Sequence, residues 1–117
     1  MSDTGGWVGV LSADLHLPDA QSIKAKRKEL QRVKHALARH CAASVAEVDH
    51  HDLWQRARIS MAIVGRDARD VEERLDAAAR RLHGDEAFLV LEEGRDIQAI
   101  ETEPAYLTGT IVGDEAE

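Results

Sequence analysis

The chain has 117 residues, a formal net charge of −7 and 44% hydrophobic residues. This length suits one domain with its own apolar core, so folding needs neither a metal nor a disulfide. One cysteine, Cys41, excludes an internal disulfide and fits a reducing cytoplasm. Residues 1–6 do not resemble a signal peptide, and no apolar run approaches the ~20 residues of a membrane span. We therefore expect a cytoplasmic protein without membrane contact.

The charges are distributed unevenly along the chain. Residues 22–40 contain every lysine, with seven basic residues against one acid, whereas the remainder has eight arginines against twenty-one acids. A basic helix on an acidic body indicates a surface for an anion or an acidic partner. The acidic total excludes indiscriminate nucleic-acid binding, but it leaves open binding through one face.

The first half of the chain predicts a strand, a helix and a hairpin. Alternating apolar residues predict a strand over 7–17, and Ser22 is the expected N-cap of the basic helix. Two further strands are predicted over 43–49 and 56–65. The turn-like residues 49–52 between them favour a hairpin.

The second half predicts another helix and an ambiguous end. Asp67 or Asp70 is the expected N-cap of this helix, and Gly84 ends it. Residues 88–91 and 97–103 fit two strands around the turn Glu93-Gly94; alternatively the first is irregular and one final strand remains.

The predicted element order is strand, helix, strand, strand, helix, strand. With right-handed crossovers this order gives an α+β, ferredoxin-like βαββαβ sandwich, in which two helices cover one face of an antiparallel sheet. We expect a single domain over 7–103, a flexible N-terminus over 1–6 and an acidic C-terminal extension over 104–117. This topology would bring the first turn of the basic helix close to the hairpin.

Lys26 stands out within the basic helix. A helical wheel places it in the apolar arc, where an unpaired buried ammonium would be very costly. It should therefore reach over the end of the sheet towards the hairpin. There it either forms an ion pair with Glu47 or Asp52, or shares an anion pocket with Arg56, which the positive end of the helix would favour.

Trp54 allows two interpretations as well. Its ring either packs over the base of the hairpin or stays exposed and stacks on a nucleic-acid base. The sheet face opposite the helices has no aromatic pair of the kind that RNA-recognition sheets use, so we place RNA contact at the hairpin end instead. The predicted contact surface consists of Lys24, Lys26, Arg27, Lys28, His50, Trp54 and Arg56.

The open sheet face carries one charged pair and one apolar patch. Asp14 and Arg58 lie on neighbouring predicted strands, so we expect a structural salt bridge and not an acid/base pair. An apolar patch on the same face requires a cover. Either Tyr106 and Leu107 of the C-terminal extension fold over it, or two chains pack sheet to sheet; we favour the homodimer. The patch consists of Val8, Val10, Ala62 and Val64.

Catalytic and metal signals are weak. Adjacent His50, His51 and Asp52 rarely converge on one ion, and His16 is the candidate third nitrogen, so we predict no metal and no cofactor. The sequence contains no G-x-S-x-G motif and no phosphate loop. An enzyme or small-anion sensor with a pocket between Lys26, His50, Asp52 and Arg56 stays an alternative to a binding protein.

Two strings carry a family resemblance. Residues 22–27 read S-I-K-A-K-R, and residues 44–57 read S-V-A-E-V-D-H-H-D-L-W-Q-R-A. Both resemble the YlxP-like family of bacterial proteins of unknown function, whose motifs are S-x-K-x-K-R and S-V-A-E-V-G-H-Q-D-L-W-Q-R-A. Asp49 and His51 depart from that pattern at the hairpin tip. The resemblance covers about residues 8–82, and the tail after Pro104 is an addition.

The resemblance implies a small cytoplasmic ferredoxin-like protein without an established activity. Genes of this family often lie beside those of an initiation factor and a ribosome-binding factor, which points to ribosome maturation or translation. We therefore favour a non-enzymatic protein that binds RNA or a ribosomal particle. The alternatives are the enzyme or anion sensor and a homodimeric scaffold for a protein partner.

Overall fold

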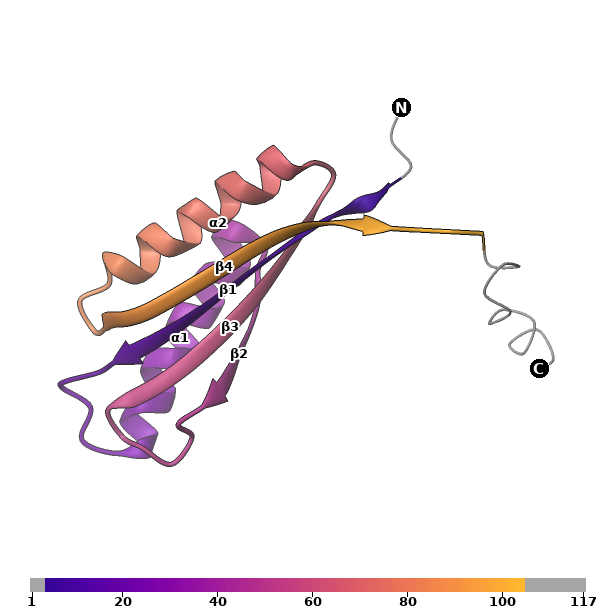
Figure 1. Ribbon diagram of the computed structural model, residues 1–117. Coiled ribbons are helices and arrows are strands. Elements are labelled where there is room, and N and C mark those ends of the chain that lie inside the picture. Colours follow the sequence, from indigo (N-terminus) through magenta and orange to yellow (C-terminus); the bar gives the residue numbers. More distant parts are fainter. Residues whose placement is uncertain (1–3, 105–117) are drawn as a thin grey trace.

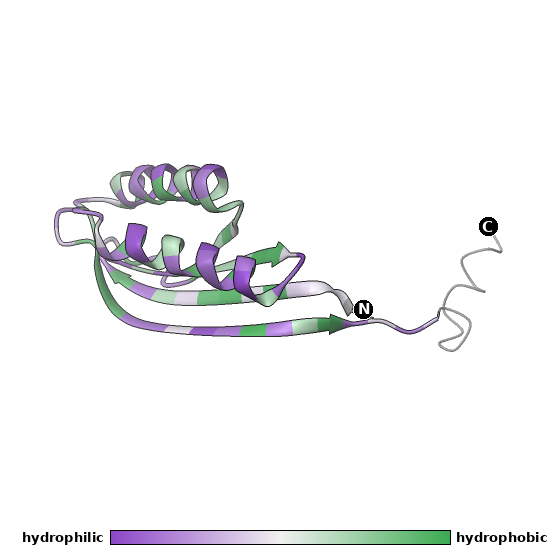
Figure 2. Cartoon of the chain, turned by 90° about the horizontal axis from the view of Figure 1, so that it is seen from above, coloured by the Kyte–Doolittle hydropathy of each residue, from purple (hydrophilic) through white to green (hydrophobic). Residues whose placement is uncertain are grey.

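The computed structural model describes residues 4–104 and confirms the predicted ferredoxin-like fold. Four antiparallel strands form one sheet in the order β2-β3-β1-β4 (Figure 1). Both helices lie on the same side of this sheet, and its other face is open (Figure 2). The elements are β1 (Thr4–His16), α1 (Ile23–Cys41), β2 (Ser44–Asp49), β3 (Arg56–Gly65), α2 (Ala68–His83) and β4 (Leu89–Glu101).

Side-chain caps start both helices. The Ser22 hydroxyl accepts a hydrogen bond from the backbone N–H of Ala25 at 3.0 Å, as an N-cap does. In α2 the cap is Asp67, which accepts from the N–H of Asp70 at 2.8 Å. Asp70 pairs instead with Arg74 one turn later, at 2.8 Å. The sequence left Asp67 and Asp70 as alternatives, and the structure selects Asp67.

The last strand agrees with the one-strand alternative in number, but it begins at Leu89 and so includes residues that this alternative left irregular. β4 is one continuous strand of 13 residues, and Glu93 and Gly94 pair with Ala13 and Ser12 in its middle. Long pairing with β1 satisfies the backbone there, so the Glu-Gly turn signal is overridden. β1 also starts earlier than predicted, because Thr4 pairs with Glu101. The predicted cover by Tyr106 and Leu107 lies outside the described residues.

The core lies between the sheet and the helices. Alternate residues of β1 and β3 point towards it, and they meet the apolar stripes of α1 and α2. Burying each large side chain contributes roughly 1.5–3 kcal/mol. Its largest apolar members, each at most 2% exposed, include Leu11, Leu15, Leu37, Ile59, Ile63, Leu75 and Leu82.

Cys41 lies in this core as a buried thiol, 1% exposed. Burial raises the pKa of this thiol, and the nearby arginines of α2 oppose the rise only in part. A raised pKa lowers the fraction of reactive thiolate. Cys41 therefore belongs to the packing of α1. In the part of the chain that the structure describes, neither helix is long and apolar enough to cross a membrane.

Candidate functional site

The β1–α1 loop and the β2–β3 hairpin are joined at one end of the sheet (Figure 1). The Gln55 carbonyl accepts from the N–H of Leu17 at 2.9 Å, and the His16 ring lies 3.1 Å from the same oxygen. The Gln55 side chain donates to the carbonyls of Pro18 at 3.0 Å and Ala20 at 3.2 Å. The hairpin is thus fixed beside the first turn of α1.

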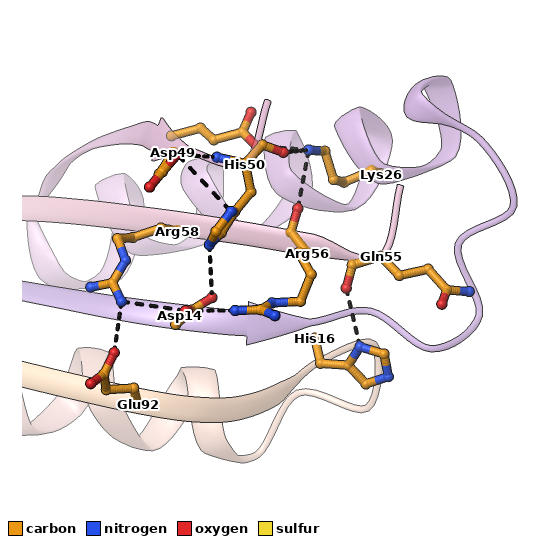
Figure 3. Close-up of polar contacts among 10 residues, drawn as sticks. Asp14, His16, Lys26, Asp49, His50, Gln55, Arg56, Arg58 and Glu92 are labelled. Atoms are coloured by element: carbon orange, nitrogen blue, oxygen red, sulfur yellow. Dashed lines mark hydrogen bonds and ion pairs between the residues drawn. The ribbon is translucent and has the colours of Figure 1, made fainter. Parts of the chain in front are cut away.

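Lys26 is an internal tie between α1 and the hairpin. Its side chain is 1% exposed, and Nζ donates to Glu47 Oε2 at 2.8 Å. Nζ also lies 2.8 Å and 3.2 Å from the carbonyl oxygens of His50 and Arg56 (Figure 3). The carbonyl oxygen of His51 lies 3.3 Å from Nζ. An ammonium has three N–H donors, and four acceptors already surround it. Lys26 therefore has no donor left for an external anion.

This geometry matches the ion-pair interpretation of Lys26, with Glu47 as its partner. Asp52 does not reach it: its side chain is exposed and makes no ion pair with any residue of the described range 4–104.

A second polar network lies on the open sheet face, around Asp14. Asp14 is 6% exposed, and its Oδ2 accepts from Arg56 at 2.8 Å and from Arg58 at 3.3 Å. Arg58 also donates to Glu92 of β4 at 2.7 Å. The His50 ring approaches the other oxygen, Oδ1, at 3.6 Å. Figure 3 shows Arg56, Arg58 and His50 converging on Asp14 from the hairpin side.

The electrostatics keep Asp14 ionised. Burial alone would raise the pKa of its carboxyl, but the hydrogen bond from Arg56 and the charges of Arg56, His50 and Arg58 outweigh burial. The pKa of Asp14 is therefore below its ordinary value. The pKa of Arg58 is raised, chiefly by its hydrogen bond to Glu92. A carboxylate held between two arginines is a structural salt bridge and a poor proton acceptor.

The seven residues of the predicted contact surface fall into two groups. Lys26, His50 and Arg56 take part in the internal networks just described. Lys24, Arg27 and Lys28 are exposed, and none of them makes an ion pair within residues 4–104. Trp54 is 54% exposed, so its ring extends into solvent from the hairpin.

Of the four residues of the predicted pocket, Lys26 pairs with Glu47, whereas His50 and Arg56 both approach Asp14. A hollow of about 420 Å³ lies along residues 52–56; Asp52 and Arg56 line it, and Lys26 and His50 do not. Among residues 4–104, no three His, Cys, Asp or Glu side chains are grouped to hold a metal ion.

The sequence reasoning missed Leu53 and Gln55. Leu53 is 49% exposed beside Trp54. It could have been identified from the sequence as an apolar residue in an otherwise polar turn. Gln55 holds the hairpin against the β1–α1 loop. Its role depends on the positions of two backbone carbonyls, which no sequence pattern specifies.

Three solved structures resemble this fold. A C-terminal segment of the alpha subunit of aIF2 from Pyrococcus abyssi has 18% identity and a TM-score of 0.44; the match covers 82% of this chain and 51% of that one. A dimeric ferredoxin-like protein from an uncultured marine organism has 14% identity and a TM-score of 0.46, with coverages of 87% and 93%. A REP-associated tyrosine transposase bound to a REP hairpin has 12% identity and a TM-score of 0.38, with coverages of 91% and 62%.

The chain thus spans about half the length of the aIF2 segment. All three scores lie below 0.5, so nothing about the function of these proteins is transferred to this chain. No curated protein matches the chain in sequence. The model of one protein family, described as a protein of unknown function (DUF503), matches residues 8–94. Because this match covers most of the chain, the protein belongs to the DUF503 family.

Proposed function

We propose that the protein is a non-enzymatic, cytoplasmic binding protein that contacts RNA or a ribosomal particle. The contact surface consists of Lys24, Arg27 and Lys28 on α1 and Trp54 on the hairpin, and we call it the α1–hairpin surface. One observation carries the proposal: three cations without ion-pair partners among residues 4–104 lie on α1, and Lys26 joins this helix to the hairpin that carries the exposed tryptophan.

The chemistry of this surface suits a nucleic acid. Lysine and arginine neutralise phosphates, and an exposed indole stacks on an unpaired base. The remainder of the chain is acidic, so it repels phosphates and leaves one end of the molecule to approach them. The resemblance of residues 22–27 and 44–57 to YlxP-like proteins supports a role near the ribosome, through the genes that accompany that family.

The test is binding of labelled single-stranded fragments of ribosomal RNA, measured by fluorescence anisotropy at several salt concentrations. We expect binding at ~50 mM salt that weakens as salt rises. The triple variant Lys24→Ala, Arg27→Ala and Lys28→Ala should bind at least about tenfold more weakly, with a smaller salt dependence. Trp54→Ala should lose roughly fivefold to a hundredfold, as expected for one lost stacking contact.

A matched control removes three exposed arginines elsewhere on the molecule. Arg66, Arg80 and Arg81 make no ion pairs with other residues of the described part of the chain, so their triple alanine variant changes the net charge equally. Equal weakening in both triple variants, or no binding at ~50 mM salt, would refute the proposal.

The open sheet face supports a second candidate, a homodimer that packs sheet to sheet. Val10 is 43% and Val64 60% exposed there, beside Val8 and Ala62 in register. Next to them a row of small residues crosses all four strands, and a hollow of about 430 Å³ lies over its Gly94 end. The row consists of Ala46, Ser60, Ser12 and Gly94. Small side chains let a second sheet approach closely.

We expect Val64→Lys to convert this dimer into a monomer, since it places a charge in the apolar patch. Light scattering coupled to size exclusion, at several protein concentrations, measures the mass. Asp52→Lys on the exposed hairpin tip is the control and should leave the mass unchanged. A wild-type protein that stays monomeric at high concentration would exclude this candidate.

A further inference from the structure

A groove separates α1 from the outer edge of the sheet, and it shares Arg27 with the α1–hairpin surface. β2 is the last strand on this side of the sheet, so alternate backbone N–H and C=O groups along it face outward. The groove has a volume of about 230 Å³. Its lining consists of Arg27, Leu30, Gln31, Lys34 and Glu47.

The periodicity of α1 explains this lining. Arg27, Gln31 and Lys34 are four and then three residues apart, so they form one stripe along the helix. Leu30 is 4% exposed and provides an apolar floor. On the other wall, Glu47 of β2 holds Lys26. An edge strand and an overlying helix thus enclose the groove, and its floor is apolar.

The groove has an uncompensated positive charge. The only acid in its lining, Glu47, is already paired with Lys26 at 2.8 Å. Arg27 and Lys34 make no ion pair with any residue between positions 4 and 104. Both cations are therefore available to an acidic group that enters the groove.

The two edges of the sheet differ in their protection against pairing with another strand. β4 carries four acids and an arginine along its length, and such charges discourage the addition of another strand. The first half of β2, residues 44–46, carries neither a charge nor a proline. The β2 edge, which lies beside the positively charged groove, is therefore also the edge that is less protected against pairing with another strand.

We propose that this groove binds an acidic, extended segment of a partner protein, which adds to β2 as a fifth strand. Backbone hydrogen bonds to the edge of β2 would hold the segment, and its acidic side chains would meet Arg27 and Lys34. RNA would also be attracted by the two cations, but it would use neither the row of backbone groups nor the apolar floor. The combination of all three features selects a peptide.

The spacing defines the segment. Arg27 and Lys34 are separated by ~10 Å along the helix, and strand residues four apart by ~13 Å, a difference that long side chains bridge. The residue midway between the two acids faces the same side of the strand and lies over Leu30. The proposed pattern is therefore acidic-x-apolar-x-acidic, in a segment of about six residues that matches the length of β2.

The probe is a fluorescein-labelled peptide with the sequence Ser-Glu-Thr-Val-Thr-Glu-Ser, titrated with the full chain and followed by anisotropy. Lys34→Glu should weaken binding at least about tenfold, because it repels one acidic side chain. Arg39→Glu is the matched control: Arg39 is exposed on the same helix and outside the groove lining, so the same charge change should weaken binding less than about twofold. Circular dichroism verifies that both variants remain folded.

Backbone methylation of the peptide tests strand addition itself. N-methyl groups on the residues whose N–H groups face β2 should abolish binding, whereas methylation of the alternate set should preserve it. The proposal is overturned if the peptide does not bind, if both methylated sets bind alike, or if the two charge reversals weaken binding equally. Binding of an RNA oligonucleotide that depends on Lys34, without peptide binding, would also overturn it.

Discussion

Replacing Lys26 by alanine should lower the free energy of unfolding by roughly 3–5 kcal/mol, the range for breaking a buried ion pair from one side. The variant leaves the Glu47 carboxylate, with its side chain 17% exposed, without a partner. It also removes the donor for the carbonyls of His50, His51 and Arg56. Urea denaturation at pH 7 measures the change.

The control for Lys26 lies two residues along the helix. Lys28 is exposed and makes no ion pair among residues 4–104, so Lys28→Ala should change stability by less than about 0.5 kcal/mol. The double variant Lys26→Met with Glu47→Leu should recover part of the loss, because neither buried charge is then left alone. A decrease in the free energy of unfolding of less than about 1 kcal/mol for Lys26→Ala would contradict the proposed stabilising role of the Lys26 contacts.

Asp14→Ala should cost about 2–3 kcal/mol, since it leaves Arg56 and Arg58 side by side without their shared carboxylate. The cost is smaller than that of Lys26→Ala because both arginines remain partly exposed and keep some hydration. Urea denaturation at pH 7 again gives the magnitude. Asp52→Ala, at an exposed and unpaired position of the described hairpin, should change stability by less than about 0.5 kcal/mol.

The same carboxylate makes stability depend on pH in a defined direction. The pKa of Asp14 is lower in the folded chain than in the unfolded one, so its contribution is present above about pH 4 and disappears as the pH falls through the folded value. Asp85 acts in the same way: burial alone would raise its pKa, and the hydrogen bond from Arg32 outweighs burial. Wild-type stability should therefore decline below about pH 4.

Asp14→Asn tests this assignment without changing the shape of the side chain. Its stability should decline less steeply than that of the wild type between about pH 4 and pH 2, so the gap between the two proteins should narrow in acid. Asp52→Asn should follow the wild-type curve. A gap that stays constant with pH would show that Asp14 does not contribute through its charge.

The sequence was sufficient for the order of the elements, because hydrophobic periodicity changes between two and 3.6 at each boundary of a strand with a helix, and polar turn residues separate the two consecutive strands. It was also sufficient to select Lys26, since a charged residue in an apolar arc must find a partner. The length of β4 could not be predicted from the sequence. That strand is held by β1, more than seventy residues away, and a local turn signal at Glu93-Gly94 cannot compete with such pairing.

The pairing of Arg56 with Asp14 was predictable but was not predicted. Arg56 and Arg58 are two residues apart in one strand, so alternation directs both towards the open face and Asp14. The convergence of three backbone carbonyls on Lys26 was not predictable. It depends on the path of the hairpin, in which His50 adopts a positive φ of 66°.

The tie through Lys26 has a consequence for any ligand of Trp54. Lys26 fixes the backbone at His50, His51 and Arg56. Gln55 is hydrogen-bonded to the β1–α1 loop, so the chain is restrained on both sides of the exposed ring. The conformational entropy of this loop is therefore lost when the protein folds and not when a ligand binds. A base that stacks on Trp54 would meet a rigid platform, so its association would be limited by encounter and not by loop ordering.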